Sequence, residues 1–250
     1  MTTRTLGMTL AALLVAGSSA VAGSTENWQF EVTPYLWMTG LEGDVTVGGR
    51  TVEFDKKFSD IIDKVDLAGS ALAVAQKGRF LVWVQADYFS LSTQEIVTAN
   101  APAGAKFETT MTIGELAVGW QVDGWADKQT FDLLVGARLT RFDSTLTVNQ
   151  VGQFKGTRNL TDPIFLLRPS IPILPSKIDG LRFNPTLGIG AGGDSKYVYE
   201  LQPQIQWQFT DHLAGRFGYR RVGYKFEADN SDNQANLRMA GLLVGLGFIW

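Results

Sequence analysis

Hydrophobic and polar residues alternate with a period of two over long segments of this chain. In the clearest segment, one set of alternate positions holds Leu201, Pro203, Ile205, Trp207 and Phe209, and the other holds Gln202, Gln204, Gln206 and Gln208. Successive side chains of a β-strand point to opposite faces, so this alternation predicts strands rather than helices. Along the whole chain it predicts ten long strands, at residues 27–38, 66–76, 79–92, 107–122, 129–147, 161–174, 180–192, 196–209, 212–227 and 236–250.

The last predicted strand is apolar on one face up to the C-terminus. Its even positions from Ala240 to Trp250 are all apolar, and its odd positions are mostly small. A transmembrane β-strand needs about 9–11 residues and turns its apolar face to lipid. Leu246, Phe248 and Trp250 resemble the C-terminal signature of bacterial outer-membrane proteins that the barrel-insertion machinery reads. The alternative is the final strand of a soluble barrel.

The connections between the predicted strands fall into two classes. Short turns at 77–78, 123–128, 175–180 and 210–211 alternate with mostly longer polar segments at 39–65, 93–106, 148–160, 193–195 and 228–235. An even strand number then brings both ends of the chain to the short-turn side, as in outer-membrane barrels. We therefore predict an all-β fold, a closed antiparallel up-and-down transmembrane β-barrel. Ten strands fit the pattern best, and eight or twelve stay open.

The positions of the cations indicate which face points inward. All ten lysines lie in predicted turns, loops or strand ends, whereas the mid-strand cations are arginines. A lysine on the lipid face would cost about 2–4 kcal/mol near the midplane, while an arginine in a narrow lumen can pair with carboxylates. We therefore expect the apolar face to meet lipid. The candidate lumen-lining residues are Glu31, Glu115, Asp132, Arg138, Arg168, Arg182, Glu200, Arg216 and Arg220.

The expected interior allows two functions. A barrel of ten strands is little wider than one of eight strands, which side chains fill. Small residues expected on the inner face would leave room for a thin aqueous path, and the arginines would make a narrow channel for small solutes weakly anion-favouring. The alternative is a side-chain-filled barrel with a structural or surface-interaction role, and a soluble periplasmic barrel that binds an apolar ligand is favoured less. The small residues are Gly69, Ala71, Ala73, Ala75, Gly188, Gly190, Gly241, Gly245 and Gly247.

The segment 39–65 is predicted to form a long first external loop. Residues 44–55 alternate around Gly48-Gly49 and predict a small hairpin. The apolar residues that follow recur at the spacing of one helix face and predict a short helix. This helix could restrict the outer mouth, rest on the rim at the lipid headgroups, or pack under its own hairpin. Its apolar residues are Phe58, Ile61, Ile62 and Val65.

Prolines and aromatic residues add detail to the predicted wall. Proline cannot donate to a strand ladder, so we expect bulges or local breaks at Pro34, Pro169, Pro172, Pro185 and Pro203. Membrane barrels carry aromatic girdles at both interfaces. We expect one girdle to include Trp28, Trp207 and Trp250 at the short-turn end, and the other to include Trp37, Tyr88, Tyr197 and Tyr224 at the long-loop end.

Residues 1–22 are predicted to be a cleaved secretory signal peptide. Arg4 supplies the positive charge, residues 9–16 the apolar core, and Ala20-Val21-Ala22 the cleavage site. Residues 23–250 are long enough for one barrel domain, which we expect in the outer membrane. The formal net charge of −3 argues against a nucleic-acid partner. The expected partners are outer-membrane lipid, lipopolysaccharide and the barrel-insertion machinery, and the oligomeric state stays open.

Several short motifs resemble a family. Pro34-Tyr35-Leu36-Trp37 followed by Gly40-Leu41 and Gly43-Asp44, then Asp162-Pro163 with Arg168, and Phe217-Gly218-Tyr219-Arg220, are similar to motifs of a widespread group of uncharacterised Gram-negative outer-membrane β-barrel proteins. The chain departs from this pattern at Leu160-Thr161, where the family often has a tryptophan. The resemblance implies an outer-membrane barrel and brings no substrate or catalytic residue.

The sequence offers little for catalysis. It has no cysteine and a single histidine, His212, in a predicted periplasmic turn, which leaves no thiolate chemistry and no His/Cys metal site. Glu115 and Asp132 on neighbouring strands could pair as glycosidase carboxylates, but the many inward arginines make salt bridges the better interpretation. We expect no catalytic residue, no cofactor and no metal, and hence no enzyme.

Overall fold

The computed structural model describes residues 27–47, 50–56, 58–61, 65–93, 105–148, 152–174, 176–227 and 234–250. The predicted signal peptide, residues 1–22, lies outside the described residues. The elements are β1 (Trp28–Val47), β2 (Arg50–Lys56), α1 (Phe58–Ile61), β3 (Val65–Lys77), β4 (Phe80–Thr93), β5 (Ala105–Asp123), β6 (Thr130–Val148), β7 (Gly152–Pro172), β8 (Leu181–Phe183), β9 (Thr186–Ala191), β10 (Tyr197–Gln202), β11 (Gln204–Thr210), β12 (Leu213–Glu227) and β13 (Gln234–Ile249).

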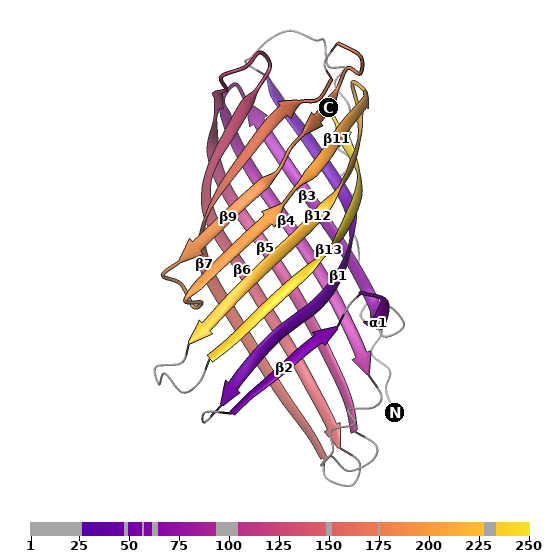
Figure 1. Cartoon of the computed structure of the whole chain (residues 1–250), viewed down its shortest axis with the longest axis vertical. Helices are drawn as coiled ribbons and strands as arrows, with labels where there is room; N and C mark the ends of the chain where they lie inside the picture. The colour runs from indigo at the N-terminus through magenta and orange to yellow at the C-terminus, as the bar shows by residue number, and fades with distance from the viewer. Residues whose placement is uncertain are drawn as a thin grey trace.

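The strands form one closed antiparallel barrel (Figure 1). Neighbours in the chain pair with each other around the wall, and β1 closes it by pairing with β13 from Glu31↔Ile249 to Thr46↔Gln234. β8 and β9 together make one barrel strand, as do β10 and β11, and β2 lies beside β1 outside the ring. The described strands therefore make ten barrel strands, and the predicted fold class is confirmed. Both Trp28 and Trp250 lie at the short-turn end, which is uppermost in Figure 1.

The first long loop is partly as predicted. β2 pairs with the outer part of β1 from Leu41↔Lys56 to Val47↔Arg50, so the expected hairpin is confirmed. The predicted helix is reduced to the four residues of α1, and Val65 begins β3 instead of extending the helix. Val65 faces Leu91 of β4 in the strand ladder, and strand pairing there replaces a second helical turn. Ile62 lies outside the described residues. Among the described helices, none is long and apolar enough to cross a membrane.

Interruptions of the ladder accompany most of the prolines, as predicted. Pro185 separates β8 from β9, and Pro203 separates β10 from β11. Pro169 lies in the part of β7 between its pairings with β9 and with β8. Pro34 is one of two consecutive β1 residues that do not pair with β13, although the register is the same on both sides of them. Because proline has no N–H to donate, each interruption falls where the ladder would have needed one.

The two faces of the wall have the predicted orientation. Leu116, Val135, Ile189 and Phe217 on the outer face are 56–66% exposed, whereas the inner-face arginines Arg138, Arg168, Arg216 and Arg220 are at most 8% exposed. One strand was predicted with the wrong face inward. In β3 the inner residues are Ser70, Leu72, Val74 and Gln76, and Gly69, Ala71, Ala73 and Ala75 face outward. Alanine and glycine fit either face, so the larger Leu72, which is 3% exposed, decides the orientation of this strand.

The aromatic residues divide differently from the prediction at the long-loop end. Trp28, Trp207 and Trp250 lie on the outer face at the short-turn end and are 38–47% exposed, so this girdle is as expected. Tyr197 is also exposed, but Trp37 and Tyr224 point into the barrel and are 4% and 2% exposed. Their alternation phase places them on the inner face, where Trp37 packs against the Arg220 guanidinium and Tyr224 hydrogen-bonds Thr140.

The rim at the long-loop end is uneven. β6 and β7 pair as far as Val148↔Gly152, and β5 pairs with β6 as far as Ala105↔Val148. Residues 105–112, 141–148 and 152–159 therefore continue beyond the turn between β9 and β10 as a projecting sheet, seen at the bottom of Figure 1. Within the described residues, the 152–159 segment of β7 pairs with β6 alone.

Candidate functional site

The centre of the barrel holds five charged side chains in mutual contact, here called the central charge cluster. Two are guanidinium groups and three are carboxylates, and they come from β4, β5, β6, β10 and β12. Each is on the inner face of its strand because it falls on the same alternation phase as its buried neighbours. The members of the cluster are Asp87, Glu115, Arg138, Glu200 and Arg220.

Arg220 contacts all three carboxylates. Its Nε donates to Glu200 Oε1 at 2.8 Å, its Nη1 to Asp87 Oδ2 at 2.7 Å and its Nη2 to Glu115 Oε1 at 3.1 Å. In the ring of ten strands β12 lies opposite β5, so the Arg220–Glu115 contact spans the lumen. A guanidinium group suits this position because it presents several donors in a rigid plane and stays charged.

Arg138 makes a second link across the lumen. Its Nε donates to Glu115 Oε1 at 3.0 Å, and its Nη2 donates to Glu200 Oε2. Tyr35 adds a hydroxyl, which donates to Asp87 Oδ1 at 2.6 Å. The ring of Trp37 lies 4.5 Å from the Arg220 guanidinium carbon, a cation–π distance. The cluster is thus tied together from several sides of the wall.

The five side chains of the cluster are closed to water. The side chains of Arg138, Glu115, Glu200, Arg220 and Asp87 have relative exposures of 0–1%. Side chains that lined a continuous aqueous path would be reached by water. At such burial, charges are tolerated only when they are paired and hydrogen-bonded, and these pairings supply that requirement.

Two further ion pairs lie between the cluster and the short-turn end. Arg168 Nη1 donates to Asp132 Oδ2 at 3.1 Å, and its guanidinium lies 4.0 Å from the ring of Trp83. Arg216 Nη2 donates to Glu31 Oε1 at 2.6 Å. These pairs add a second polar layer to the interior.

The other half of the interior, toward the long loops, is mainly apolar. Trp37 and Phe89 meet edge to face at 5.5 Å, and Tyr224 exchanges a hydrogen bond of 2.9 Å with Thr140. Buried Met111, Ile113, Val222 and Met239 belong to the same hydrophobic core. Side chains therefore occupy the lumen on both sides of the central charge cluster.

The structure brings eight of the nine predicted interior residues into direct ion pairs. Arg182 is the exception, since its Nε donates to Ser170 Oγ at 2.6 Å and its Nη2 to the carbonyl of Lys128 at 2.6 Å. Asp87, Tyr35 and Trp37 were not predicted to take part. Asp87 was hidden because the inner face of β4 is otherwise mostly apolar, with Leu81, Trp83 and Phe89. Because Asp87 is an even number of residues from each of them, alternation alone could have predicted that it points into the barrel.

The single histidine lies away from the buried charges. His212 occupies the short turn between β11 and β12, is exposed, and its Nδ1 lies 3.0 Å from the carbonyl oxygen of Ile249. Among the described residues, no group of three or more His, Cys, Asp or Glu side chains could hold a metal ion.

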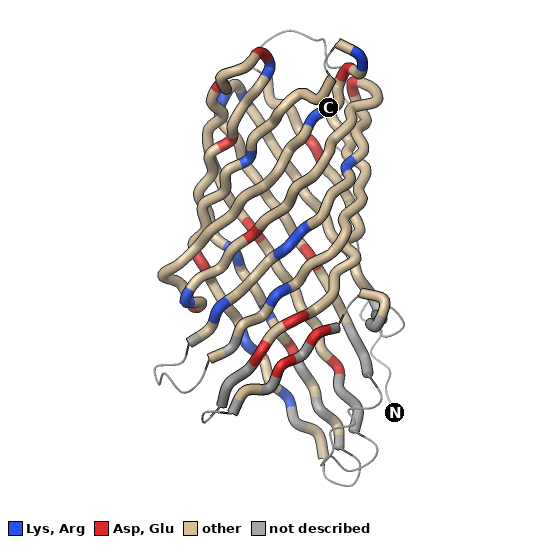
Figure 2. Tube along the Cα trace, viewed as in Figure 1, with Lys and Arg blue, Asp and Glu red and all other residues tan. Residues whose placement is uncertain are grey.

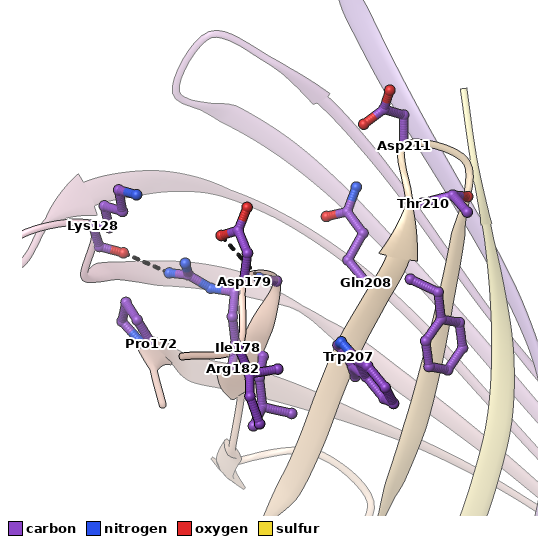
Figure 3. A pocket seen from close by; sticks show the side chains of 12 residues that line it. Lys128, Pro172, Ile178, Asp179, Arg182, Trp207, Gln208, Thr210 and Asp211 are labelled. Carbon is purple, nitrogen blue, oxygen red and sulfur yellow. Dashed lines mark hydrogen bonds between the residues drawn. The ribbon is translucent and has the colours of Figure 1, made fainter. Parts of the chain in front are cut away.

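A cavity of about 460 Å³ opens at the short-turn end, between the end of β11 and the turn that precedes β8. Figure 3 shows Lys128, Asp179 and Asp211 along one side of it, with Pro172, Ile178 and Trp207 on the other. Arg182 also lines the cavity, and its guanidinium donates to the Lys128 carbonyl. The cavity combines both signs of charge with turn residues and lies apart from the central charge cluster.

The fold is that of known outer-membrane β-barrels. The structure is similar to the outer membrane protease OmpT from Escherichia coli, with a TM-score of 0.54 and 9% identity over 92% of this chain and 99% of that chain. The structure is less similar to Ail, the attachment invasion locus protein of Yersinia pestis, with a TM-score of 0.38 and 8% identity over 90% of this chain and 99% of that chain. It is also less similar to Neisserial surface protein A, with a TM-score of 0.31 and 10% identity over 89% of this chain and 99% of that chain. No protein-family model and no curated protein matches the sequence. The OmpT similarity shows the fold.

Proposed function

We propose that this chain is an integral protein of the Gram-negative outer membrane whose barrel is closed by side chains and serves a structural or surface-interaction role. The observation that carries the proposal is the central charge cluster, whose side chains are 0–1% exposed and reach from β12 to β5 across the lumen. This geometry favours the filled barrel over a narrow anion channel. The exposed large hydrophobic residues on the outer face of most barrel strands support a lipid environment.

The projecting sheet supports the surface-interaction part of the proposal. It extends beyond the β9–β10 turn and carries exposed polar residues such as Arg141, Lys155 and Thr157. An edge that pairs on one side only is a common place for another chain to add a strand. No catalytic role is part of the proposal. His212 lies in the short turn between β11 and β12, beside Ile249.

Membership of the resembled family of uncharacterised outer-membrane barrels is part of the proposal. Residues of two separate motifs meet in the core: Tyr35 and Trp37 from the first, and Arg220 from the last. A third motif contributes Asp162, which is 1% exposed and accepts hydrogen bonds from the backbone N–H and the hydroxyl of Ser195. The motifs thus occupy positions that hold the barrel interior together. Export by residues 1–22 and insertion through Leu246, Phe248 and Trp250 complete the proposal.

Planar-bilayer recording of the purified barrel tests it. The wild-type protein should give no stepwise current. The double variant Arg138→Ala/Glu200→Ala removes an opposite-charge pair from the cluster and should give small steps, because it takes away the link between β6 and β10. The matched control Arg141→Ala/Asp143→Ala removes an exposed pair from the projecting sheet and should stay silent. Stepwise, anion-selective current through the wild type would contradict the proposal and restore the channel.

A further inference from the structure

The outer face of the barrel changes from apolar to charged at one level on three neighbouring strands. On β12 the last outward residue before the change is Tyr219 and the next is Arg221. On β13, Ala240 pairs with Arg221, and Arg238 follows two residues farther toward the long loops. On β1, Glu42 stands directly opposite Arg238. Figure 2 shows these basic positions beside the acidic β1–β2 hairpin.

This level matches the outer boundary of the hydrocarbon. Ten residues separate Arg238 from Phe248 on β13. At about 3.3 Å per residue and a tilt of about 40°, they rise about 25 Å, which is the height of the apolar band of outer-membrane barrels. Phe248 is exposed and lies two residues before Trp250 of the short-turn girdle, so Arg238 and Arg221 lie where the headgroups of the opposite, outer leaflet begin.

The two arginines share one carboxylate. Arg221 Nη2 and Arg238 Nε lie 3.0 and 3.2 Å from the same oxygen, Glu42 Oε1. These three groups carry two positive charges and one negative charge, and Asp55 of β2 lies opposite Glu42. Both Nε atoms are shielded from water; the Arg238 Nε contact with Glu42 is an ion pair without hydrogen-bond geometry, and Arg221 Nε has no hydrogen-bond partner among the described residues. The arginine side chains are 38% and 41% exposed, so further acceptors can reach them from outside.

Tyr199 completes one side of the patch. It pairs with Gly223, and a Cβ on Gly223 would lie 2.2 Å from Tyr199 Cε1, so the tyrosine ring lies across this glycine. Gly223 is two residues from Arg221 on β12, so the tyrosine lies beside this arginine. Tyrosine is typical of the membrane interface because its ring is apolar and its hydroxyl is polar.

We infer that Arg221 and Arg238 bind a phosphate group of the phosphorylated glycolipid of the outer leaflet, lipopolysaccharide, with its acyl chains against Tyr219 and Leu242 below. The inference rests on the proposed outer-membrane location. Guanidinium groups bind phosphate through paired, charge-assisted hydrogen bonds, and the shared Glu42 holds both groups in place while neutralising only one. A headgroup phosphate would accept hydrogen bonds from the exposed parts of the two guanidinium groups.

Titration of the folded barrel in detergent micelles with bisphosphorylated lipid A tests the site. Each basic residue near a lipid surface contributes about fivefold in affinity, so the Arg221→Gln/Arg238→Gln variant should bind about 25-fold more weakly. The Glu42→Gln variant should bind more tightly because both guanidinium groups then face the phosphate. The control Arg79→Gln removes an exposed, ion-paired arginine at the short-turn rim and should not change binding.

Several results would overturn the inference. Equal affinity of the wild type and the double arginine variant for lipid A, with both folded as judged by circular dichroism, is one. Equal binding of dephosphorylated lipid A or of phosphatidylglycerol micelles would remove the phosphorylated-glycolipid assignment. If the double variant does not fold, unchanged or weaker binding by Glu42→Gln decides against the site. Failure of the wild type to insert into lipid vesicles would instead contradict the proposed location.

Discussion

The outer and inner faces of the same strands follow different rules. The outer face is uniformly apolar across its middle, and Leu116 and Val135 stand there without specific polar partners. The inner face mixes charged, aromatic and aliphatic residues, and each charge has defined partners, as Glu115 has in Arg138 and Arg220. Lipid requires only that a side chain be apolar, whereas a filled interior requires complementary shape and charge. A substitution should therefore be costly for different reasons on the two faces.

The largest effect is expected inside. Arg220→Met would leave Asp87, Glu115 and Glu200 buried with Arg138 as the one remaining guanidinium of the cluster. Loss of one partner of a buried ion pair typically costs about 3–5 kcal/mol, and we expect a loss of this size in the free energy of unfolding. Urea unfolding in lipid vesicles measures it. Arg79→Met, which removes an arginine with a 55% exposed side chain, should cost less than about 1 kcal/mol. Equal losses would show that burial of the cluster is unimportant.

A charge placed on the outer face should cost somewhat less. Leu116 neighbours Glu115 in the chain but is 57% exposed, so Leu116→Arg would put a guanidinium group into the hydrocarbon near the midplane. The expected destabilisation is about 2–4 kcal/mol. Trp125→Arg is the control, because Trp125 is 93% exposed in a short turn. If Leu116→Arg were tolerated as well as Trp125→Arg in vesicle unfolding, the assignment of this face to lipid would be wrong.

Two glycines differ in how closely the neighbouring strand packs against them, with no charge involved. A Cβ on Gly241 would lie 1.8 Å from the Met38 carbonyl oxygen, whereas a Cβ on Gly69 would have nothing within 4 Å. Gly241→Ala must therefore displace the β1 backbone, and overpacking of this kind costs about 1–3 kcal/mol. Gly69→Ala should change stability by a few tenths of a kcal/mol at most. Thermal unfolding of the two variants in the same micelles compares them, and a larger loss for Gly69→Ala would contradict the backbone geometry.

The sequence predicted the outer face well because lipid imposes one simple pattern. Alternation predicted the strands and the inward position of the arginines. The alternation of short and long connections predicted the even number of strands and hence the closed barrel. The predicted orientation of β3 was wrong because Ala71 and Ala73 fit either face and have no polar atom that would indicate the inner one. The helix was predicted too long because Ile61 and Val65 have helical spacing, whereas Val65 pairs with β4 as the first residue of β3.

The partners inside the barrel could not be predicted in the same way. Arg220 reaches Glu115 across 105 residues of sequence and the whole lumen. Such a contact depends on the register of every strand between them, and alternation says nothing about register at that distance. Trp37 shows the same limit, because its place over Arg220 depends on how β1 and β12 align around β13.

The smallest effect is expected where a charged pair is neither buried nor near lipid. On the projecting sheet, Asp143 accepts hydrogen bonds from Arg141 Nε at 2.6 Å and from Thr157 Oγ1 at 2.6 Å, and these bonds lower the pKa of its carboxyl. A lowered folded-state pKa stabilises the fold at pH values above the unfolded-state pKa, and this contribution is lost as the pH falls through the folded-state pKa. NMR titration should show the Asp143 midpoint below that of an ordinary aspartate, and Arg141→Gln should raise it. An unchanged midpoint would mean that Arg141 does not hold this carboxylate. Because the pair is exposed, unfolding in vesicles at pH 7 should hardly distinguish this variant from the wild type, in contrast to Arg220→Met.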